Sequence, residues 1–442
     1  MAASYIHRTN SSGSGTTATV SMWVKQNQVT ADGGLFQFYT DSSNYVSGYS
    51  NPTVKFRTYI SDSYGQGDKA SVIENQDPGA WYHYVFVFDT TNETPGDRMR
   101  LWINGVRATG DQISSDTDPS DSYSFTPLVS GVFSINQYAA NSTYSDHEYS
   151  HVHYTDGYAY DASTFGEFDS TSGIWKIKTD PTVTYGTNGV FLKFEDRTNL
   201  DLDSSTNAHT MTTVGTPTPT YDNPSNNFAT MNPIANDSQT FSNGSKTITW
   251  TTNNKLNLST LGMASGKWYA ECKATDINSG TSGTLIGVGT AANFMDTYLS
   301  AVNSGWGYRC QTGNIQNGAG NEAYGDTYTD GDIIGVAIDV DNGYVYMSKN
   351  GVWQDSGDPT SGASGTGAAN NQPSYGAVLS GTQFFGCSSY DTDVLSWNFG
   401  DGYYATTSTG TTEADDAGIG QFKYDVPAGF YALCTKNMKE YG

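Results

Sequence analysis

Residues 331–353, GDIIGVAIDVDNGYVYMSKNGVW, constrain the fold more than any other stretch of the chain. Ile333 to Asp339 is an apolar run rich in β-branched residues and without a helix cap, which favours a strand. Asn342-Gly343 is a turn signal, because Asn and Gly tolerate the positive φ of a tight hairpin. Tyr344 to Ser348 is then a second strand, and Asn350-Gly351 is another turn. The stretch therefore predicts an antiparallel hairpin in the middle of a sheet.

Further strand-like segments surround this hairpin in a fixed order. They are Gly266 to Ala274 (GKWYAECKA), Leu285 to Thr290 (LIGVGT), Gly305 to Cys310 (GWGYRC), Tyr375 to Leu379 and Val394 to Asn398. With the G-D-x-I-G-V-x-x-D strand and its N-G turn, they resemble the SPRY domain, a β-sandwich binding module, over residues 245–402. The resemblance implies that ligands contact loops at one end of the sandwich. Carried over, it points to Trp306, Tyr308, Arg309, Tyr324 and Tyr390.

The first part of the chain carries a second set of strand patterns. Ala18 to Val24 alternates, and Trp81 to Asp89 (WYHYVFVFD) leads into Arg98 to Ile103 and the turn Asn104-Gly105. The strand spacing is typical of a sandwich. These motifs resemble the laminin-G-like, concanavalin-A-like lectin sandwich from residue 1 to about Lys178. The resemblance implies that a calcium ion near the rim is an alternative to a metal-free domain.

The composition supports an all-β fold, because Gly is 49, Tyr 31 and Phe 19, and no long apolar helical periodicity is present. We predict two antiparallel, jelly-roll-like β-sandwiches, a laminin-G-like one at 1–178 and a SPRY-like one with a C-terminal extension at 245–442. An extended connector rich in Pro, Ser, Thr and Asn joins them at 179–244 and adds one or two strands. Val190 to Phe194 is expected to be one of these. We expect a mobile surface loop at 357–372 and a second exposed stretch at 413–420.

The negative charge is spread along the chain. Residues 1–175 hold 8 Lys+Arg and 19 Asp+Glu, giving −11, and residues 176–442 hold 13 and 26, giving −13. This balance argues against nucleic acid or an anionic membrane as a partner. No signal-peptide core and no run of 18 apolar residues is present. The four cysteines have no C-x-x-C spacing, so a zinc site is not expected, and Cys272 is predicted to be a small buried hydrophobe.

Four further segments carry a resemblance that spans nearly the whole chain. They are Val152 to Ile177, Tyr185 to Asp203, Asp222 to Pro233 and Val426 to Asn437. They resemble segments of uncharacterised structural proteins of marine tailed bacteriophages, which have the same order of laminin-G-like domain, connector and SPRY domain. The resemblance implies a virion protein that is made in the host cytoplasm without a signal peptide.

No motif predicts catalysis. Glycosidases of concanavalin-like fold use an E-x-D-x-x-E strand, which is absent, and Glu167-Phe168-Asp169 is the nearest half-match in a Ser/Gly-rich loop. His151 and His153 share one strand face in this interpretation, so they either approach a metal ion or form hydrogen-bonded imidazoles on an exposed strand. Asp201 to Ser205 has a partial calcium-loop pattern. We predict no catalytic residues, no metal site and no cofactor.

Aromatic side chains are the other candidate binding groups. Tyr45, Tyr49, Tyr64, Tyr138 and Tyr144 lie in Ser/Gly/Asn-rich segments and are interpreted as loop tyrosines. Such rings either stack on sugars and partner proteins or pack against their own turns.

The function expected from these patterns is non-enzymatic binding. The first hypothesis is a tail fibre or receptor-binding component that recognises host-surface glycan or protein. The alternative is a structural decoration or cementing protein of capsid or tail without direct host binding, which the absence of coiled-coil heptads and of an anchoring domain before the first sandwich favours. In either case we expect a homo-oligomer with other virion proteins as partners, no nucleic acid and no membrane insertion.

Overall fold

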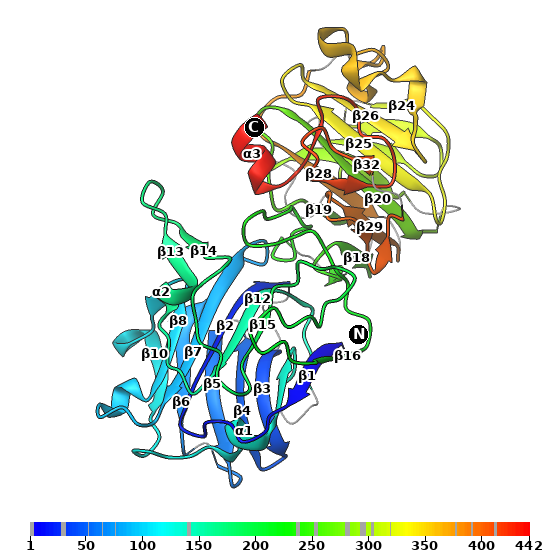
Figure 1. The fold of residues 1–442 in the computed structure, drawn as a ribbon. Coiled ribbons are helices and arrows are strands. Elements are labelled where there is room, and N and C mark those ends of the chain that lie inside the picture. Colours follow the sequence, from blue (N-terminus) through cyan, green and yellow to red (C-terminus); the bar gives the residue numbers. More distant parts are fainter. Residues whose placement is uncertain are drawn as a thin grey trace. The chain divides into compact units, whose positions relative to one another are not determined.

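The computed structural model describes residues 4–27, 32–51, 53–63, 65–75, 77–138, 143–235, 239–251, 255–278, 283–291, 298–301, 305–318, 320–375, 378–389, 392–410 and 413–442. The chain forms two compact units (Figure 1). Unit 1 comprises Met1–Pro219 and Asn223–Ser225, and unit 2 comprises Thr220–Asp222 and Asn226–Gly442. Each contains two main antiparallel sheets, which confirms the predicted all-β class with two β-sandwich domains.

Unit 1 has an eight-stranded and a six-stranded sheet. The larger sheet has the strand order β10 (Ile113–Thr117), β6 (Asp68–Glu74), β5 (Thr53–Ile60), β4 (Asn44–Asn51), β3 (Gly33–Asp41), β11 (Val132–Ile135), β1 (Tyr5–Thr9) and β16 (Thr212–Val214). The smaller has the order β15 (Val190–Leu192), β12 (His147–Asp156), β2 (Thr17–Gln26), β7 (Trp81–Asp89), β8 (Met99–Ile103) and β9 (Val106–Arg107). Short elements complete the unit: η1 (Pro95–Asp97), η2 (Gly110–Gln112), α1 (Thr126–Ser130), α2 (Ala162–Phe165), β13 (Gly166–Phe168) and β14 (Trp175–Ile177).

The core of unit 1 lies between these two sheets. On β2 the alternate residues Val20, Met22 and Val24 are buried there, and on β7 Phe86 and Phe88 join them. Successive strand side chains point to opposite faces, so the remaining residues of β2 and β7 lie on the outer face of the six-stranded sheet.

The chain itself covers this outer face. The helix α2 brings Phe165 against Val85 and Val87 of β7. The hairpin β13–β14 brings Trp175, whose indole Nε1 donates to His83 Nδ1 at 3.0 Å. Figure 1 shows α2 and this hairpin beside the strands β7 and β8. Residues 157–178 therefore fill one of the two outer sheet surfaces of unit 1.

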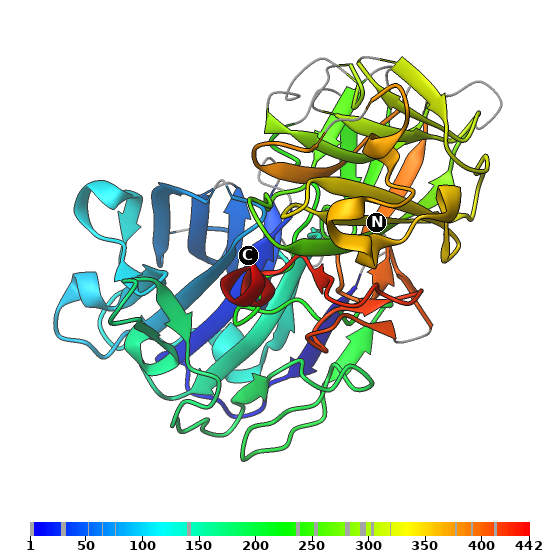
Figure 2. The same ribbon diagram turned by 90° about the horizontal axis from the view of Figure 1, so that it is seen from above.

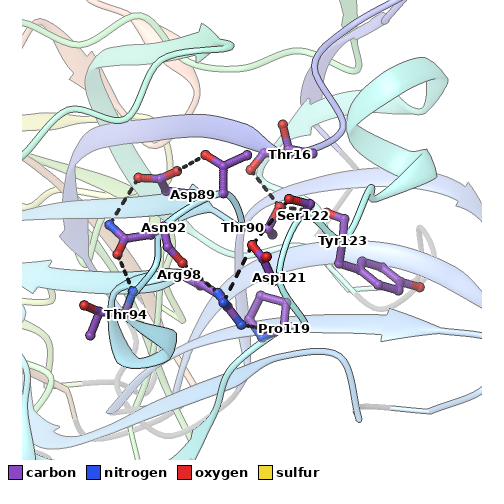
Figure 3. Close-up of polar contacts among 11 residues, drawn as sticks. Thr16, Asp89, Thr90, Asn92, Thr94, Arg98, Pro119, Asp121, Ser122 and Tyr123 are labelled. Atoms are coloured by element: carbon purple, nitrogen blue, oxygen red, sulfur yellow. Dashed lines mark hydrogen bonds and ion pairs between the residues drawn. The ribbon is translucent and has the colours of Figure 1, made fainter.

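Polar contacts close the connection between β7 and β8, as Figure 3 shows. The Arg98 guanidinium donates to the carbonyls of Asn92 at 2.9 Å and Pro119 at 3.1 Å, and lies 3.7 Å from an Asp121 carboxylate oxygen. The Thr90 hydroxyl donates to the Tyr123 carbonyl at 2.8 Å. These bonds satisfy loop carbonyls that would otherwise depend on water, so they stabilise the loop conformation.

Unit 2 also has two main sheets. The first has the order β17 (Gln239–Ser242), β18 (Thr247–Trp250), β29 (Val394–Asn398), β20 (Lys267–Asp276), β25 (Ile333–Asp339), β26 (Tyr344–Lys349) and β27 (Val352–Trp353), with β34 (Tyr431–Ala432) paired to β20. The second has the order β19 (Lys255–Leu258), β28 (Gln383–Ser389), β21 (Leu285–Thr290), β22 (Trp306–Arg309), β23 (Asn314–Asn317) and β24 (Gly320–Ala323). The other elements are η4 (Gln354–Ser356), η5 (Pro359–Ser364), η6 (Ala369–Asn371), the pairs β30 (Tyr403–Tyr404) with β31 (Thr407–Ser408) and β32 (Glu413–Ala414) with β33 (Gln421–Phe422), and α3 (Thr435–Tyr441).

The predicted central hairpin is present as β25 and β26, with Asp339 paired to Tyr344 around the Asn342-Gly343 turn. The expected strand at 375–379 is not formed by the described residues of that segment, and the following strand is β28. The core between the sheets includes Trp268, Trp397 and Cys272. All four cysteines are buried and free, which agrees with the interpretation of Cys272.

A second core covers the outer face of the first sheet of unit 2. Residues after the last SPRY-like strand supply Phe422, Phe430 and Ala432, which pack with Tyr269 and Tyr346 of the sheet. Figure 2 shows this C-terminal segment and the helix α3 in red. The C-terminal extension is therefore an integral layer of unit 2.

The two expected surface segments, 357–372 and 413–420, contain exposed residues but are also held by buried groups. The loop at 357–372 is packed: Asn370 is fully buried, donates to the Gly343 carbonyl at 2.8 Å and accepts from the Val345 N–H at 3.1 Å. In the stretch at 413–420, the buried Asp415 carboxylate accepts backbone N–H bonds from Ile419 and Ala432 at 2.7 and 2.9 Å. A buried amide or carboxylate needs such partners, so each residue fixes its loop.

The boundary between the units falls inside the predicted connector. Val190 to Phe194 does supply a strand to the first sandwich, because β15 pairs with β12. The segment is less extended than expected, since Phe228 and Met231 are buried in unit 2. Apolar side chains of this size are buried wherever the fold offers them a core, even in a Pro- and Asn-rich segment. Within the described part of the chain, no helix is long and apolar enough to cross a membrane.

We expect limited proteolysis to cut the chain first at residues 215–216. Both are exposed and lie outside any strand, between β16 and the packed residues of unit 2. Exposed chain with little local structure is the preferred site of nicking. Mass spectrometry of early digests should find two fragments that end near this point. A first cut between 226 and 235 would contradict the packing of that segment.

Candidate functional site

The residues predicted for the ligand site of the SPRY-like domain do not form an exposed surface. Trp306, Tyr308 and Tyr324 are all buried in the core of unit 2. The Tyr308 hydroxyl donates to the Asp326 carbonyl, and Tyr324 donates to the Gly367 carbonyl at 3.3 Å. These rings cannot stack on a ligand without unfolding the sandwich, so their assignment as binding residues is corrected.

The other two predicted residues do not rebuild that site. Arg309 is half-buried, and its Nη2 donates to Gln311 Oε1 at 3.0 Å. Tyr390 lies outside the described residues. The alternation in GWGYRC already indicates that these aromatic residues are buried. Trp306, Tyr308 and Cys310 alternate with Gly307 and Arg309, so their side chains point to the same face of the sheet.

We expect Tyr308→Phe to lower the free energy of unfolding of unit 2 by about 1 kcal/mol, because the Asp326 carbonyl loses its buried donor. Urea titration of the full chain should show this loss in the transition of unit 2. Tyr158→Phe is the matched control, since Tyr158 is exposed on unit 1. An unchanged midpoint for Tyr308→Phe would mean that the hydrogen bond contributes nothing.

The predicted loop carboxylates Glu167 and Asp169 lie on the hairpin β13–β14 and at its turn. Lys176 pairs with both, at 3.2 Å and 3.5 Å. Hydrogen bonds from the backbone of Ser172 and Thr171 lower the pKa of Asp169 to about 2. Both side chains are exposed to solvent or nearly so, and the described contacts give them a role in the hairpin alone.

The histidines of β12 are buried groups. Burial lowers the pKa of His147 to about 3 and of His151 to about 4, and it holds the pKa of His153 well below its usual value. The register shifts between Ser150 and His153, and His151 has a φ of 46°. This β-bulge breaks the strict alternation on which a shared, exposed strand face depended. Among the residues that the structure describes, no group of three or more His, Cys, Asp or Glu could hold a metal ion.

The partial calcium pattern at 201–205 forms a turn. Asp203 is buried, and its carboxylate accepts from the N–H groups of Phe191, Ser205 and His209 at 2.9, 2.9 and 2.8 Å. Asp201 accepts from the Thr213 hydroxyl at 3.0 Å. Turn-forming bonds to protein donors therefore account for both carboxylates.

The outer face of β3, β4 and β5 carries a row of tyrosines that sequence reasoning missed. Tyr39 pairs with Tyr45, and Tyr45 pairs with Tyr59. The ring centroids of Tyr45 and Tyr59 are 5.0 Å apart. Phe38 and Val46, which alternate with these tyrosines, face the core. Tyr39 and Tyr59 are half-buried, and Tyr45 between them is buried.

A row of polar residues crosses the same face beside the tyrosines. In strand order it consists of His7, Ser134, Gln37, Ser47, Arg57 and Asp68. The Arg57 Nε donates to Asp68 Oδ1 at 2.7 Å, and its Nη1 donates to the Tyr49 hydroxyl at 2.6 Å. The hydroxyls of Ser47 and Ser134 are buried and make no hydrogen bond. Both side chains have no exposed surface, so these hydroxyls lie beneath the surface of this face.

Lys55 lies on this face next to Tyr49. Its ammonium is 5.3 Å from the centre of the Tyr49 ring, which in turn stacks on Tyr138 with 3.9 Å between ring centroids. Among the residues that the structure describes, no carboxylate forms an ion pair with Lys55. We call Tyr39, Tyr45, Tyr49, Lys55, Arg57 and Tyr59 the tyrosine face.

Two of these residues differ from expectation. Tyr45 and Tyr49 were interpreted as loop tyrosines, but both lie on the strand β4. Gly48 between them stands where a Cβ would meet Phe36 Cε1 at 2.4 Å, so the turn-like sequence reflects a close approach in the core. Tyr138 and Tyr144 do lie outside regular strands, and Tyr64 lies outside the described residues.

Comparison with known protein families finds one match within each unit. The profile described as "Concanavalin A-like lectin/glucanases superfamily" matches residues 2–146, and the SPRY domain profile matches residues 267–373. The SPRY domain of human HERC1 is 19% identical, covers 38% of this chain and 96% of its own, and has a TM-score of 0.30. Another human SPRY domain is 14% identical, with coverage of 36% and 94% and a TM-score of 0.27. No curated protein matches the chain. Within the chain, a concanavalin A-like lectin/laminin G domain at residues 2–146 is thus followed by a SPRY domain at residues 267–373.

Proposed function

We propose that this protein is a non-enzymatic binding protein of a tailed-phage particle, a tail fibre or receptor-binding component that recognises a glycan or protein on the host surface. The observation that carries the proposal is the tyrosine face, because aromatic rings with polar tips, such as the half-buried Tyr39, beside the ammonium of Lys55 suit recognition of polar surfaces. Two binding domains in one chain support the same role. The phage assignment rests on the resemblance of residues 152–177, 185–203, 222–233 and 426–437 to phage structural proteins.

The buried carboxylates favour binding over catalysis. Glu271 accepts from the N–H groups of Lys423 and Tyr424 at 2.9 and 3.0 Å, and Asp393 accepts from the Asn278 N–H at 2.9 Å and the Ser389 hydroxyl at 2.7 Å. A general acid or base must reach its substrate. These groups instead hold neighbouring segments of unit 2.

The test is adsorption of the purified full chain to host cells. We expect the labelled chain to bind the cell surface and to compete with phage particles for adsorption. Binding to particles without binding to cells would instead support the alternative, a decoration or cementing protein. Cryo-electron microscopy of the particle would then show on which part it sits and with which symmetry.

A further inference from the structure

The hairpin β13–β14 extends away from the sheets of unit 1, as Figure 1 shows. Its base is held there, because Trp175 donates to His83. Its outer part, residues 167–174, contributes to none of the hydrophobic clusters that the described residues form. Phe168 is 53% exposed and Ile174 67% exposed in this outer part. The hairpin therefore carries two large apolar side chains into solvent that the fold of unit 1 does not use.

Polar contacts within the hairpin give this outer part a defined shape. The Asp169 carboxylate accepts from the N–H groups of Thr171 and Ser172 at 3.0 and 2.9 Å, which fixes the turn. Lys176 bridges the two strands through its ion pairs with Glu167 and Asp169. A two-stranded hairpin is only marginally stable by itself, so these bonds matter for its shape. A segment that is already ordered loses little conformational entropy when it binds a partner.

The outer edge of β13 is open, because β13 and β14 form a two-stranded sheet of their own. The Asp169 N–H donates to the Ile174 carbonyl at 2.8 Å. The Lys178 N–H donates to the Phe165 carbonyl at 3.0 Å. Bonded and non-bonded pairs alternate along an antiparallel ladder, so the N–H and C=O of Phe168 point away from β14. An open edge beside apolar side chains is a template for pairing with a strand of another chain.

The charge of the hairpin favours a second copy of this chain as the partner. Two carboxylates and two ammonium groups make residues 166–178 neutral, whereas the whole chain carries a net charge of −24. Two copies repel each other over most of their surface, and this repulsion is weakest where a neutral segment meets its equal. A strand edge can also pair antiparallel with the same edge of a second copy across a two-fold axis, which requires no further complementary surface.

We propose that two copies of this chain associate through their hairpins, with the outer edges of β13 paired antiparallel and Phe168 and Ile174 of each copy covered by the other. Two hairpins bury less than the roughly 1,200 Å² of a stable complex, so the free chains associate weakly. Copies that a particle holds side by side reach an effective concentration of about 1 mM, at which weak pairing is sufficient. The inference uses no residue of the tyrosine face, so it stands or falls separately from the proposed host binding.

The test is sedimentation velocity of the full chain between about 2 and about 200 µM, the range in which a weak dimer forms and dissociates. We expect the wild type to shift from monomer to dimer. Phe168→Ser with Ile174→Ser should weaken the association by about tenfold or more, because the apolar contact is lost. Phe168→Pro should abolish it, since proline lacks the outward N–H, whereas Phe168→Val keeps that N–H and should still associate.

Val106→Ser is the matched control, because Val106 is 49% exposed on β9, outside the hairpin. It should leave the association unchanged, and the melting temperature of unit 1 should stay within a few degrees of the wild type in every variant. A wild type that remains monomeric would overturn the second copy as the partner. Equal association of the proline and valine variants would overturn the pairing of β13. An equal loss in Val106→Ser would show that the hairpin is not the contact.

Discussion

Ending the chain at Asn398 should prevent unit 2 from folding, although the SPRY match ends at residue 373. The deletion removes Phe422, Phe430 and Ala432, which cover Tyr269 and Tyr346. Burial of one large apolar side chain contributes about 1.5–3 kcal/mol. Losing two phenylalanines and exposing two tyrosines therefore removes about as much free energy as the whole unfolding free energy of a typical domain. Differential scanning calorimetry of the shortened chain should show the transition of unit 1 alone.

Glu271 adds to the effect of this deletion. It is fully buried in the wild type, and its carboxylate accepts hydrogen bonds from the Tyr404 hydroxyl and from the backbone of Lys423 and Tyr424. Burial raises the pKa of Glu271 because it destabilises the charged carboxylate. The charged form therefore depends on these donors. The control is a chain that starts at Asn226 and keeps its C-terminus, which should melt cooperatively. A cooperative transition in residues 226–398 would refute the role of the C-terminal layer.

Acidification from pH 7 to pH 4 should unfold unit 1 before unit 2. All six histidines lie at or before His209, within unit 1. Burial lowers the pKa of His83 and His147 to about 3 each. A depressed histidine pKa contributes stability that is fully present above the unfolded value of about 6.5 and is lost as the pH falls towards the folded value. At pH 4 the contribution of each of these two histidines to the free energy of unfolding has fallen by about 3 kcal/mol. The two losses together approach the total stability of a domain.

The contacts of His83 explain why it resists protonation. Trp175 Nε1 donates to its Nδ1 at 3.0 Å, so the ring proton resides on Nε2, which donates to the Ser21 hydroxyl at 2.9 Å. A proton on Nδ1 would face the indole N–H, and the buried cation has no counter-charge among these contacts.

Calorimetry between pH 7 and pH 4 measures this effect. We expect the melting temperature of unit 1 to fall more steeply than that of unit 2. His83→Phe should flatten the pH dependence of unit 1, at the cost of some stability at pH 7 because the Trp175 N–H loses its acceptor. Parallel slopes for both units in the wild type would contradict the prediction.

The sequence predicts the framework of this protein better than its surfaces. The hairpin β25–β26 follows from local signals, because a β-branched run and an Asn-Gly turn have few other ways to fold. The tyrosine face does not, because Tyr39, Tyr45 and Tyr59 become neighbours only through the pairing register of three strands. Register depends on long-range packing, such as the contact of Gly48 with Phe36, that no single segment encodes.

The errors about the site have a similar cause. Trp306 and Tyr308 were assigned to the surface from a family resemblance, whereas their shared parity with Cys310 places all three in one core. The error about His151 has a different origin. The sequence suggests a regular alternation of side chains along the strand, but the β-bulge at this residue interrupts it. Segments 226–235 and 357–372 pack despite polar compositions because a few buried groups, Phe228 and Asn370 among them, fix each one.

The positions of the cysteines allow the opening of unit 2 to be measured by thiol labelling. Cys272, Cys310, Cys387 and Cys434 are all buried and free, and all belong to unit 2. Burial raises the pKa of Cys387 to about 12 and that of Cys272 as well, so neither thiol offers a thiolate to a reagent in the closed state. The rate at which a small thiol reagent labels the chain therefore measures how often unit 2 opens. Unit 1 contains none of the four cysteines and is not labelled. The labelling rate of the intact protein therefore measures the opening kinetics of unit 2 alone.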